Sequence, residues 1–178
     1  MNVPNALTMA RLGIALVSFV LMWMDYWMVA SVLLLAAVGM DILDGLLARR
    51  LGQVSFGGVY LDVMADKIVI ISTYLMLGIK LDSAFFLLGL LMLVREYTID
   101  TMRSIAAAKQ VVLSADKYSK IKGVMFMTAM LMMSFNAALS TMLPSVTLAS
   151  LVIASVGMLL AYVTLGRFFL RYLRPLLS

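Results

Sequence analysis

Four aspartates within 26 residues are the feature of this sequence that most directly suggests chemistry. They are four of the nine acidic residues of the chain and form two pairs, Asp41/Asp44 and Asp62/Asp66. Spacings of three and four residues place both members of a pair on one face of a helix. Apolar segments flank both pairs, and a charged group inside a membrane helix costs about 2.5–3.5 kcal/mol. This concentration of negative charge therefore predicts a bound cation.

The residue types that the sequence lacks limit the chemistry of such a site. The chain contains no histidine and no cysteine. A general base must therefore be a carboxylate, a lysine or a tyrosine, and a metal must be held by oxygen atoms. Oxygen ligands favour Mg²⁺, Mn²⁺ or Ca²⁺. Four carboxylates suffice for two ions that share a ligand, an arrangement used in phosphoryl chemistry.

Three residues between the two pairs suit a phosphorylated ligand. Gly45 has no side chain and lets a ligand approach the helix backbone. Arg49 carries a guanidinium that matches phosphate oxygens, and Ser55 offers a hydroxyl. Separately, a positive-inside anchor would explain Arg49 with Arg50, and a tight turn would explain the glycines Gly52, Gly57 and Gly58. Together with four aspartates, these residues favour a site that binds both a metal and a phosphate.

The composition predicts an all-α, polytopic membrane protein with a single domain over residues 1–178. Hydrophobic residues make up 64% of the chain, against roughly 45–50% in soluble domains. The net charge of +5 fits contact with anionic lipid better than contact with nucleic acid. Six segments have the length and polarity of spanning helices. They are Ala6–Met24, Trp27–Leu47, Leu61–Ile79, Ala84–Ser104, Val124–Leu143 and Val146–Phe169.

The basic residues predict the orientation of these spans. An even number of spans places both termini on one side of the membrane. Thirteen of the fourteen lysines and arginines then fall on that side, and Lys80 alone falls on the other. Positive residues collect in the cytoplasm, so we expect cytoplasmic termini and a cytoplasmic aspartate site. No basic residue precedes the first apolar run, and we expect the first helix to be retained.

Asn5, Thr8 and Arg11 recur at spacings of three, so they share one face of the first predicted helix. Taken alone, this segment favours an ordinary capped helix start, with Arg11 reaching to lipid headgroups.

A second group of basic residues starts in the fourth predicted span. Arg95 and Arg103 are eight residues apart and lie within about 80° of each other around a helix. An arginine inside an apolar segment needs a partner. That partner is either an anionic ligand or a carboxylate, such as Glu96, Asp100 or a motif aspartate. Lys117, Lys120 and Lys122 extend the basic group at the start of the fifth span. Headgroup contact is an alternative explanation for all three, and it is the preferred one for Lys117 and for Lys109.

The aspartate stretch resembles the signature of the CDP-alcohol phosphotransferase family, D-x2-D-G-x2-A-R-x8-G-x3-D-x3-D. The resemblance implies a CDP-linked donor, usually CDP-diacylglycerol, whose phosphatidyl group is transferred to an alcohol with release of CMP. Six spans and two cytoplasmic termini also agree with this family. Every position of the signature is matched here, at Asp41, Asp44, Gly45, Ala48, Arg49, Gly58, Asp62 and Asp66.

The same resemblance implies roles for individual residues. Asp41, Asp44, Asp62 and Asp66 would hold one or two Mg²⁺ or Mn²⁺ ions. Asp66 would also act as the general base that takes the proton from the acceptor hydroxyl. The CDP part of the donor would contact Gly45, Arg49 and Ser55, together with Asn5 and Thr8 of the first helix.

The second basic group is similar to that of one branch of the family, the phosphatidylglycerophosphate synthases. It shares the Arg95-Glu96 pair, Arg103 and a basic element over residues 119–123. The implied acceptor is sn-glycerol 3-phosphate, with its phosphate near Arg95, Arg103, Lys120 and Lys122. Ser119, Gly123 and Val63 depart from the residues usual in that branch.

Several alternatives remain at this point. Within the family, a cardiolipin synthase or a phosphatidylinositol-phosphate synthase would use a different acceptor. Outside it, a divalent-cation transporter or an inactive subunit would also carry buried aspartates. The resemblance further implies a homodimer in a bacterial plasma membrane.

Overall fold

The computed structural model describes the backbone of residues 3–51, 56–110, 119–139 and 141–177. Side chains are described for residues 8–40, 61–110, 120–139 and 141–171. This part of the chain forms six α-helices and contains no strand, which confirms the all-α prediction. The helices are α1 (Val3–Trp23), α2 (Trp27–Leu51), α3 (Phe56–Lys80), α4 (Ser83–Ala108), α5 (Ser119–Ala137) and α6 (Pro144–Leu177).

Helix α5 differs from its predicted segment at both ends, and α6 extends eight residues beyond the predicted Phe169, to Leu177. We predicted a span over Val124–Leu143, whereas α5 starts five residues earlier, at Ser119, and ends at Ala137. Its end coincides with a side-chain clasp. The buried Asn136 amide donates to the Leu143 carbonyl and to Thr147 Oγ1, and its oxygen accepts from the Leu143 amide. These bonds hold the end of α5 against the start of α6, and Pro144 opens α6, where proline loses no helical hydrogen bond.

One helical stretch within the described residues, Pro144–Arg171, is long and apolar enough to cross a membrane by length and composition. The apolar parts Thr8–Trp23 and Trp27–Met40 are shorter. A membrane location is consistent with this finding. The six-span topology and the orientation remain predictions.

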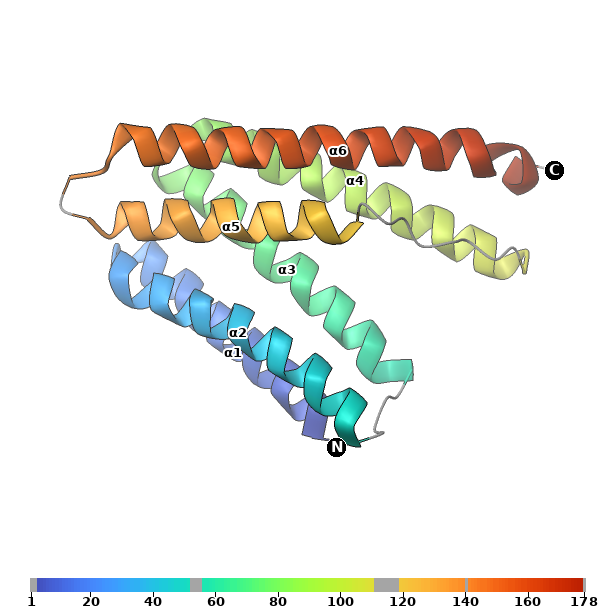
Figure 1. Cartoon of the computed structure of the whole chain (residues 1–178), viewed down its shortest axis with the longest axis horizontal. Helices are drawn as coiled ribbons and strands as arrows, with labels where there is room; N and C mark the ends of the chain where they lie inside the picture. Colours follow the sequence, from blue (N-terminus) through green and yellow to red (C-terminus); the bar gives the residue numbers. More distant parts are fainter. Residues whose placement is uncertain (1–2, 52–55, 111–118, 140, 178) are drawn as a thin grey trace.

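The six helices form three antiparallel hairpins, α1–α2, α3–α4 and α5–α6 (Figure 1). The three short turns lie toward one end of the bundle, and the starts of α1, α3 and α5 lie toward the other. Helix α3 packs against α1, α4 and α5, so it connects all three hairpins. Charged residues in the first turns of α3 therefore face more than one neighbouring helix.

The core around α3 is aromatic in the half of the bundle away from the aspartates. Tyr74 is fully buried and packs against the rings of Phe85 on α4 and Phe126 on α5. Its hydroxyl donates to the Phe126 carbonyl at 3.1 Å. A buried tyrosine needs such a partner for its hydroxyl, and this bond fixes α5 against α3.

The turn end of the bundle carries a separate ion pair. Lys80 Nζ lies 3.1 Å from both carboxylate oxygens of Asp25 and 5.3 Å from the centre of the Trp23 ring. The pair joins the α1–α2 turn to the end of α3. It also neutralises the one basic residue that we predicted on the outer side of the membrane.

Gly78 allows the α3–α4 hairpin to close, and we predict that Gly78→Ala destabilises the protein. A Cβ atom at this position would overlap the backbone nitrogen and the Cβ of Phe86. Overpacking of this kind costs about 1–3 kcal/mol. Thermal unfolding in detergent should show a lower midpoint for Gly78→Ala. The control is Gly13→Ala on α1, where no atom lies within 4 Å of the added Cβ and helix propensity favours alanine by about 1 kcal/mol. Equal midpoints for the two variants would contradict the prediction.

Candidate functional site

The second aspartate pair of the motif is bound by an arginine from the first helix. Arg11 Nη2 lies 2.7 Å from Asp62 Oδ1, and Arg11 Nη1 lies 3.1 Å from Asp66 Oδ1. Nη2 also donates to the backbone carbonyl of Asp62 at 3.2 Å. As predicted from their spacing, the two aspartates lie on one face of α3. That face is directed at α1.

Helix α1 turns a polar face toward this pair. Thr8 and Arg11 are both buried, with exposed fractions of 3% and 2%. Ala15, Ser18 and Met22 continue the same buried stripe at spacings of three and four. The shared face predicted for Thr8 and Arg11 is therefore confirmed. The interpretation of Arg11 as a residue that reaches to headgroups is wrong, because its guanidinium binds carboxylates inside the bundle.

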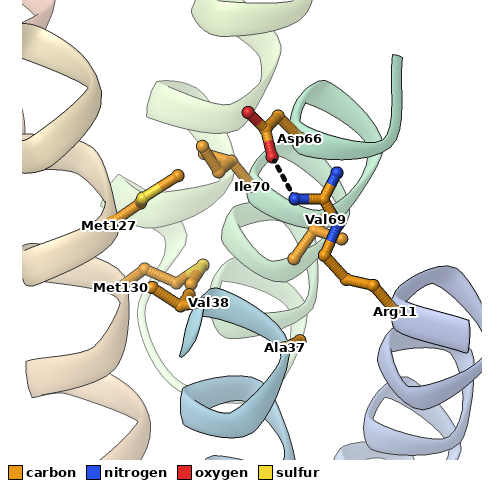
Figure 2. Close-up of a pocket in the computed structure, with 8 residues that line it drawn as sticks. All are labelled: Arg11, Ala37, Val38, Asp66, Val69, Ile70, Met127 and Met130. Carbon is orange, nitrogen blue, oxygen red and sulfur yellow. Dashed lines mark ion pairs between the residues drawn. The ribbon is translucent and has the colours of Figure 1, made fainter. Parts of the chain in front are cut away.

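Apolar side chains close the inner side of this ion pair (Figure 2). A small cavity of about 10 Å³ beside Arg11 and Asp66 is walled by Ala37 and Val38 of α2 and by Met127 and Met130 of α5. This volume holds about one water molecule at most. The Asp62 and Asp66 side chains, in contrast, are 40% and 35% exposed. The two carboxylates are thus accessible to solvent on one side, and on the other side they bind Arg11 next to the apolar residues of α2 and α5.

A larger cavity of about 300 Å³ lies on the other side of Asp66, between α3, α4 and α5. We call it the α3–α4–α5 cavity. Apolar residues line most of it, including Ile70, Met92 and Phe126. The ionisable residues that line it are Asp66, Lys67, Arg95, Glu96, Arg103 and Lys122.

The cations of this cavity differ in burial. Arg95 and Lys122 are 7% and 6% exposed, whereas Arg103 is exposed. Arg95 Nη1 pairs with Glu96, as one of the sequence-based alternatives proposed. Arg95 Nε is buried and has no hydrogen-bond partner among the described residues.

Lys67 is a residue that the sequence reasoning missed. Its Nζ lies 2.6 Å from both carboxylate oxygens of Asp100 and 3.3 Å from Glu96 Oε2. It directly follows Asp66, so it points about 100° away from that residue, toward α4 instead of α1. A lysine one position beyond the motif, at the start of an apolar segment, was the available signal, because such a charge needs a partner.

The structure brings together part of the predicted site. Asp62 and Asp66 both pair with Arg11. Arg95, Arg103 and Lys122 line the same cavity as Asp66. Lys120 is exposed and is not among the cavity residues, because two residues correspond to about 200° around α5. Predictions for Asn5, Asp41, Asp44, Gly45, Arg49 and Ser55 concern side chains outside the described part.

The described side chains alone do not form a complete metal centre. Among them, no three aspartates or glutamates lie close enough to hold a metal ion. The carboxylate oxygens of Asp62 and Asp66 do converge, but on the guanidinium of Arg11. The first aspartate pair would have to supply the remaining ligands.

Comparison with known proteins relates this sequence to a family. The sequence profile of the CDP-alcohol phosphatidyltransferases matches residues 1–171. A CDP-diacylglycerol–glycerol-3-phosphate 3-phosphatidyltransferase of Wigglesworthia glossinidia brevipalpis is 33% identical over 129 residues, covering 68% of this chain and 70% of the relative. The Bacillus subtilis (strain 168) protein of the same name is 26% identical over 136 residues, with coverages of 68% and 70%.

A third protein of that name, from Rickettsia typhi, is 29% identical over 132 residues, covering 72% of this chain and 74% of the relative. The relatives and the profile agree with the aspartate signature. The chain belongs to the CDP-alcohol phosphatidyltransferase family.

Proposed function

We propose that this protein transfers the phosphatidyl group of CDP-diacylglycerol to sn-glycerol 3-phosphate, with release of CMP. Membership of the family supports the reaction class, and the names of the relatives support both substrates. The observation that carries the proposal is the α3–α4–α5 cavity. It combines the last motif aspartate with a group of cations suited to a phosphorylated alcohol.

The charge of the cavity suits a phosphate monoester. Four cationic side chains, those of Lys67, Arg95, Arg103 and Lys122, line it together with the carboxylates of Asp66 and Glu96. Lys67 is already paired with Asp100, so the other three cations face two carboxylates and leave a formal surplus of +1. A volume of about 300 Å³ also matches a small, polar acceptor. In this proposal Arg95, Arg103 and Lys122 bind the acceptor phosphate, with Lys120 at the outer surface of α5.

Asp66 is the proposed general base. It lines the cavity, so an acceptor anchored by the cations would present a hydroxyl within its reach. The acceptor oxygen forms a bond to the phosphorus that carries diacylglycerol, and its proton passes to the Asp66 carboxylate. The bond from that phosphorus to the bridging oxygen breaks, and this oxygen leaves with CMP.

The proposed metal ligands are Asp41, Asp44, Asp62 and Asp66, holding one or two Mg²⁺ or Mn²⁺ ions. The donor set fits, since the two described aspartates already place oxygen atoms around one cationic group, and hard divalent ions prefer oxygen. When bound, such an ion stabilises negative charge on the pyrophosphate and on the leaving CMP.

The CDP part of the donor is proposed to contact Asn5, Thr8, Gly45, Arg49 and Ser55. Thr8 supports this placement, because it is buried one helical turn before Arg11, on the face of α1 that meets the aspartates.

The proposed setting is a bacterial plasma membrane crossed six times, with a homodimer and a site open to the cytoplasm. The relatives are bacterial. The described charges also agree with this orientation. Lys80 is paired with Asp25 at the turn end, and the cations near the aspartates lie toward the other end, where positive residues mark the cytoplasm.

Release of CMP by the purified protein tests this function. We expect release from CDP-diacylglycerol only when both glycerol 3-phosphate and Mg²⁺ or Mn²⁺ are present, and we expect EDTA to abolish it. Parallel reactions contain phosphatidylglycerol or inositol phosphate as acceptor. Release with one of those acceptors alone would keep the chemistry and change the substrate. Folded protein that releases no CMP with any acceptor would contradict the proposal and favour a transporter.

We predict that Asp66→Asn binds the CDP donor but loses turnover. The amide cannot accept the acceptor proton, and general bases contribute about 100- to 10,000-fold to rates. The measurements are CMP release and binding of CDP-diacylglycerol. Asp25→Asn is the matched control, since it changes a carboxylate at the far end of the bundle and should turn over normally. Turnover by Asp66→Asn at the rate of the unmodified protein would exclude Asp66 as the base.

We predict that Arg103→Ala raises the KM for glycerol 3-phosphate about 10- to 100-fold and leaves the KM for CDP-diacylglycerol unchanged. A charge-assisted hydrogen bond to the acceptor phosphate contributes about 1.5–3 kcal/mol. Arg95→Ala should act in the same direction. Lys109→Ala, at the C-terminal cap of the same helix, is the control. A change confined to the donor KM would show that this arginine belongs to the donor site.

A further inference from the structure

Arg11 contacts two aspartates, Asp62 and Asp66, whose carboxylates the proposed reaction needs at fixed positions relative to each other. One guanidinium donates from Nη2 to Asp62 and contacts Asp66 through Nη1. Each aspartate uses its Oδ1 atom in these contacts. The terminal torsion of an aspartate is otherwise broad and soft. Fixing one oxygen of each carboxylate therefore fixes the direction of the other.

The guanidinium itself cannot turn freely. Arg11 is 2% exposed, and the side chains of Val38, Val69 and Met130 close the space around it (Figure 2). Nη2 is additionally bound to the Asp62 backbone carbonyl. The contact thus fixes the orientation of the two carboxylates relative to the backbone of α3 and to the packed side chains of α1.

Both contacts depend on the shape of the side chain as well as on its charge. A guanidinium presents two terminal nitrogens on a rigid plane, so one group can reach two carboxylates a helical turn apart. A lysine at this position would carry the same charge on a single nitrogen. It could neutralise the pair, and it could contact both carboxylates from one nitrogen as Lys67 does with Asp100 and Glu96, but it would not hold them in the two fixed directions that a planar guanidinium sets.

We propose that Arg11 is a positioning residue that orients the Asp62 and Asp66 carboxylates through its two terminal nitrogens. It does not touch substrate in this proposal. Its effect on turnover rests on the proposed function, whereas its effect on cation binding by the aspartates does not. Groups that orient the ligands of a metal change metal affinity about 10- to 100-fold when removed.

Arg11→Lys tests the proposal, because it keeps the charge and removes the planar pair of nitrogens. Two measurements are made on the purified full chain in detergent. The first is kcat and KM for glycerol 3-phosphate from CMP release. The second is the Kd for Mn²⁺ without substrates, from the electron paramagnetic resonance signal of free Mn²⁺. Ser18→Ala is the control, since Ser18 is buried on the same face of α1 and bonds only to its own helix, at Ile14.

We expect Arg11→Lys to lower kcat about 100-fold, as small misplacements of reacting groups do. The KM for glycerol 3-phosphate should stay within about twofold, because the cations of the cavity are untouched, and the Kd for Mn²⁺ should rise about tenfold. Ser18→Ala should match the unmodified protein in all three values. If Arg11→Lys does not fold, Arg11→Gln is measured instead. This variant removes the charge together with the second nitrogen, and a Kd for Mn²⁺ equal to that of the unmodified protein would still overturn the proposal.

Coinciding Mn²⁺ titrations for Arg11→Lys and the unmodified protein would overturn the proposal and leave Arg11 as a counter-charge alone. A raised KM for glycerol 3-phosphate with unchanged kcat would also overturn it. If the unmodified protein releases no CMP, the proposed function fails, and the Mn²⁺ titrations still decide the role of Arg11.

Discussion

The ion pairs of Arg11 with Asp62 and Asp66 are the constraint on which the described site depends. A guanidinium that is 2% exposed must have its charge compensated inside the bundle, because an unpaired buried charge is strongly unfavourable. The two aspartates provide this compensation from α3. Helices α1 and α3 can therefore meet only in a register that brings Arg11 to this pair. The orientation of the second half of the aspartate motif follows from that register.

Charged side chains of helix α3 point toward two different neighbouring helices, α1 and α4. Asp66 faces Arg11 on one side and lines the α3–α4–α5 cavity on the other, so it is shared by both arrangements. Lys67, the next residue, points to α4 and binds Asp100 and Glu96. Glu96 in turn pairs with Arg95. The chain of ion pairs ties the position of the motif aspartate to the cations proposed to bind the acceptor.

The two ends of the bundle have different physical roles. Close packing and neutral hydrogen bonds dominate the turn end, with Gly78 against Phe86 and the Asn136 clasp between α5 and α6. The one ion pair described at this end, between Lys80 and Asp25, joins the α1–α2 turn to the end of α3. The aspartate end instead gathers buried charges next to a cavity. Rigid packing at one end lets the helices hold charged side chains at fixed positions at the other.

The sequence by itself determined the helical class, the aspartate motif and the family, because these depend on composition and on spacings along the chain. It predicted that Asp62 and Asp66 share a face, and Thr8 and Arg11 likewise. It did not reveal that the two faces meet, since Arg11 and Asp62 are 51 residues apart and periodicity within a helix carries no record of which helix lies opposite. The start of α5 at Ser119 was also missed, because polar residues lower apolarity without ending a helix. Only the tertiary structure decided that Lys67 pairs with the carboxylates of α4. It also decided that Arg95, Arg103 and Lys122 line one cavity with Asp66. Both follow from the packing of α3 against α4 and α5, which brings these side chains together.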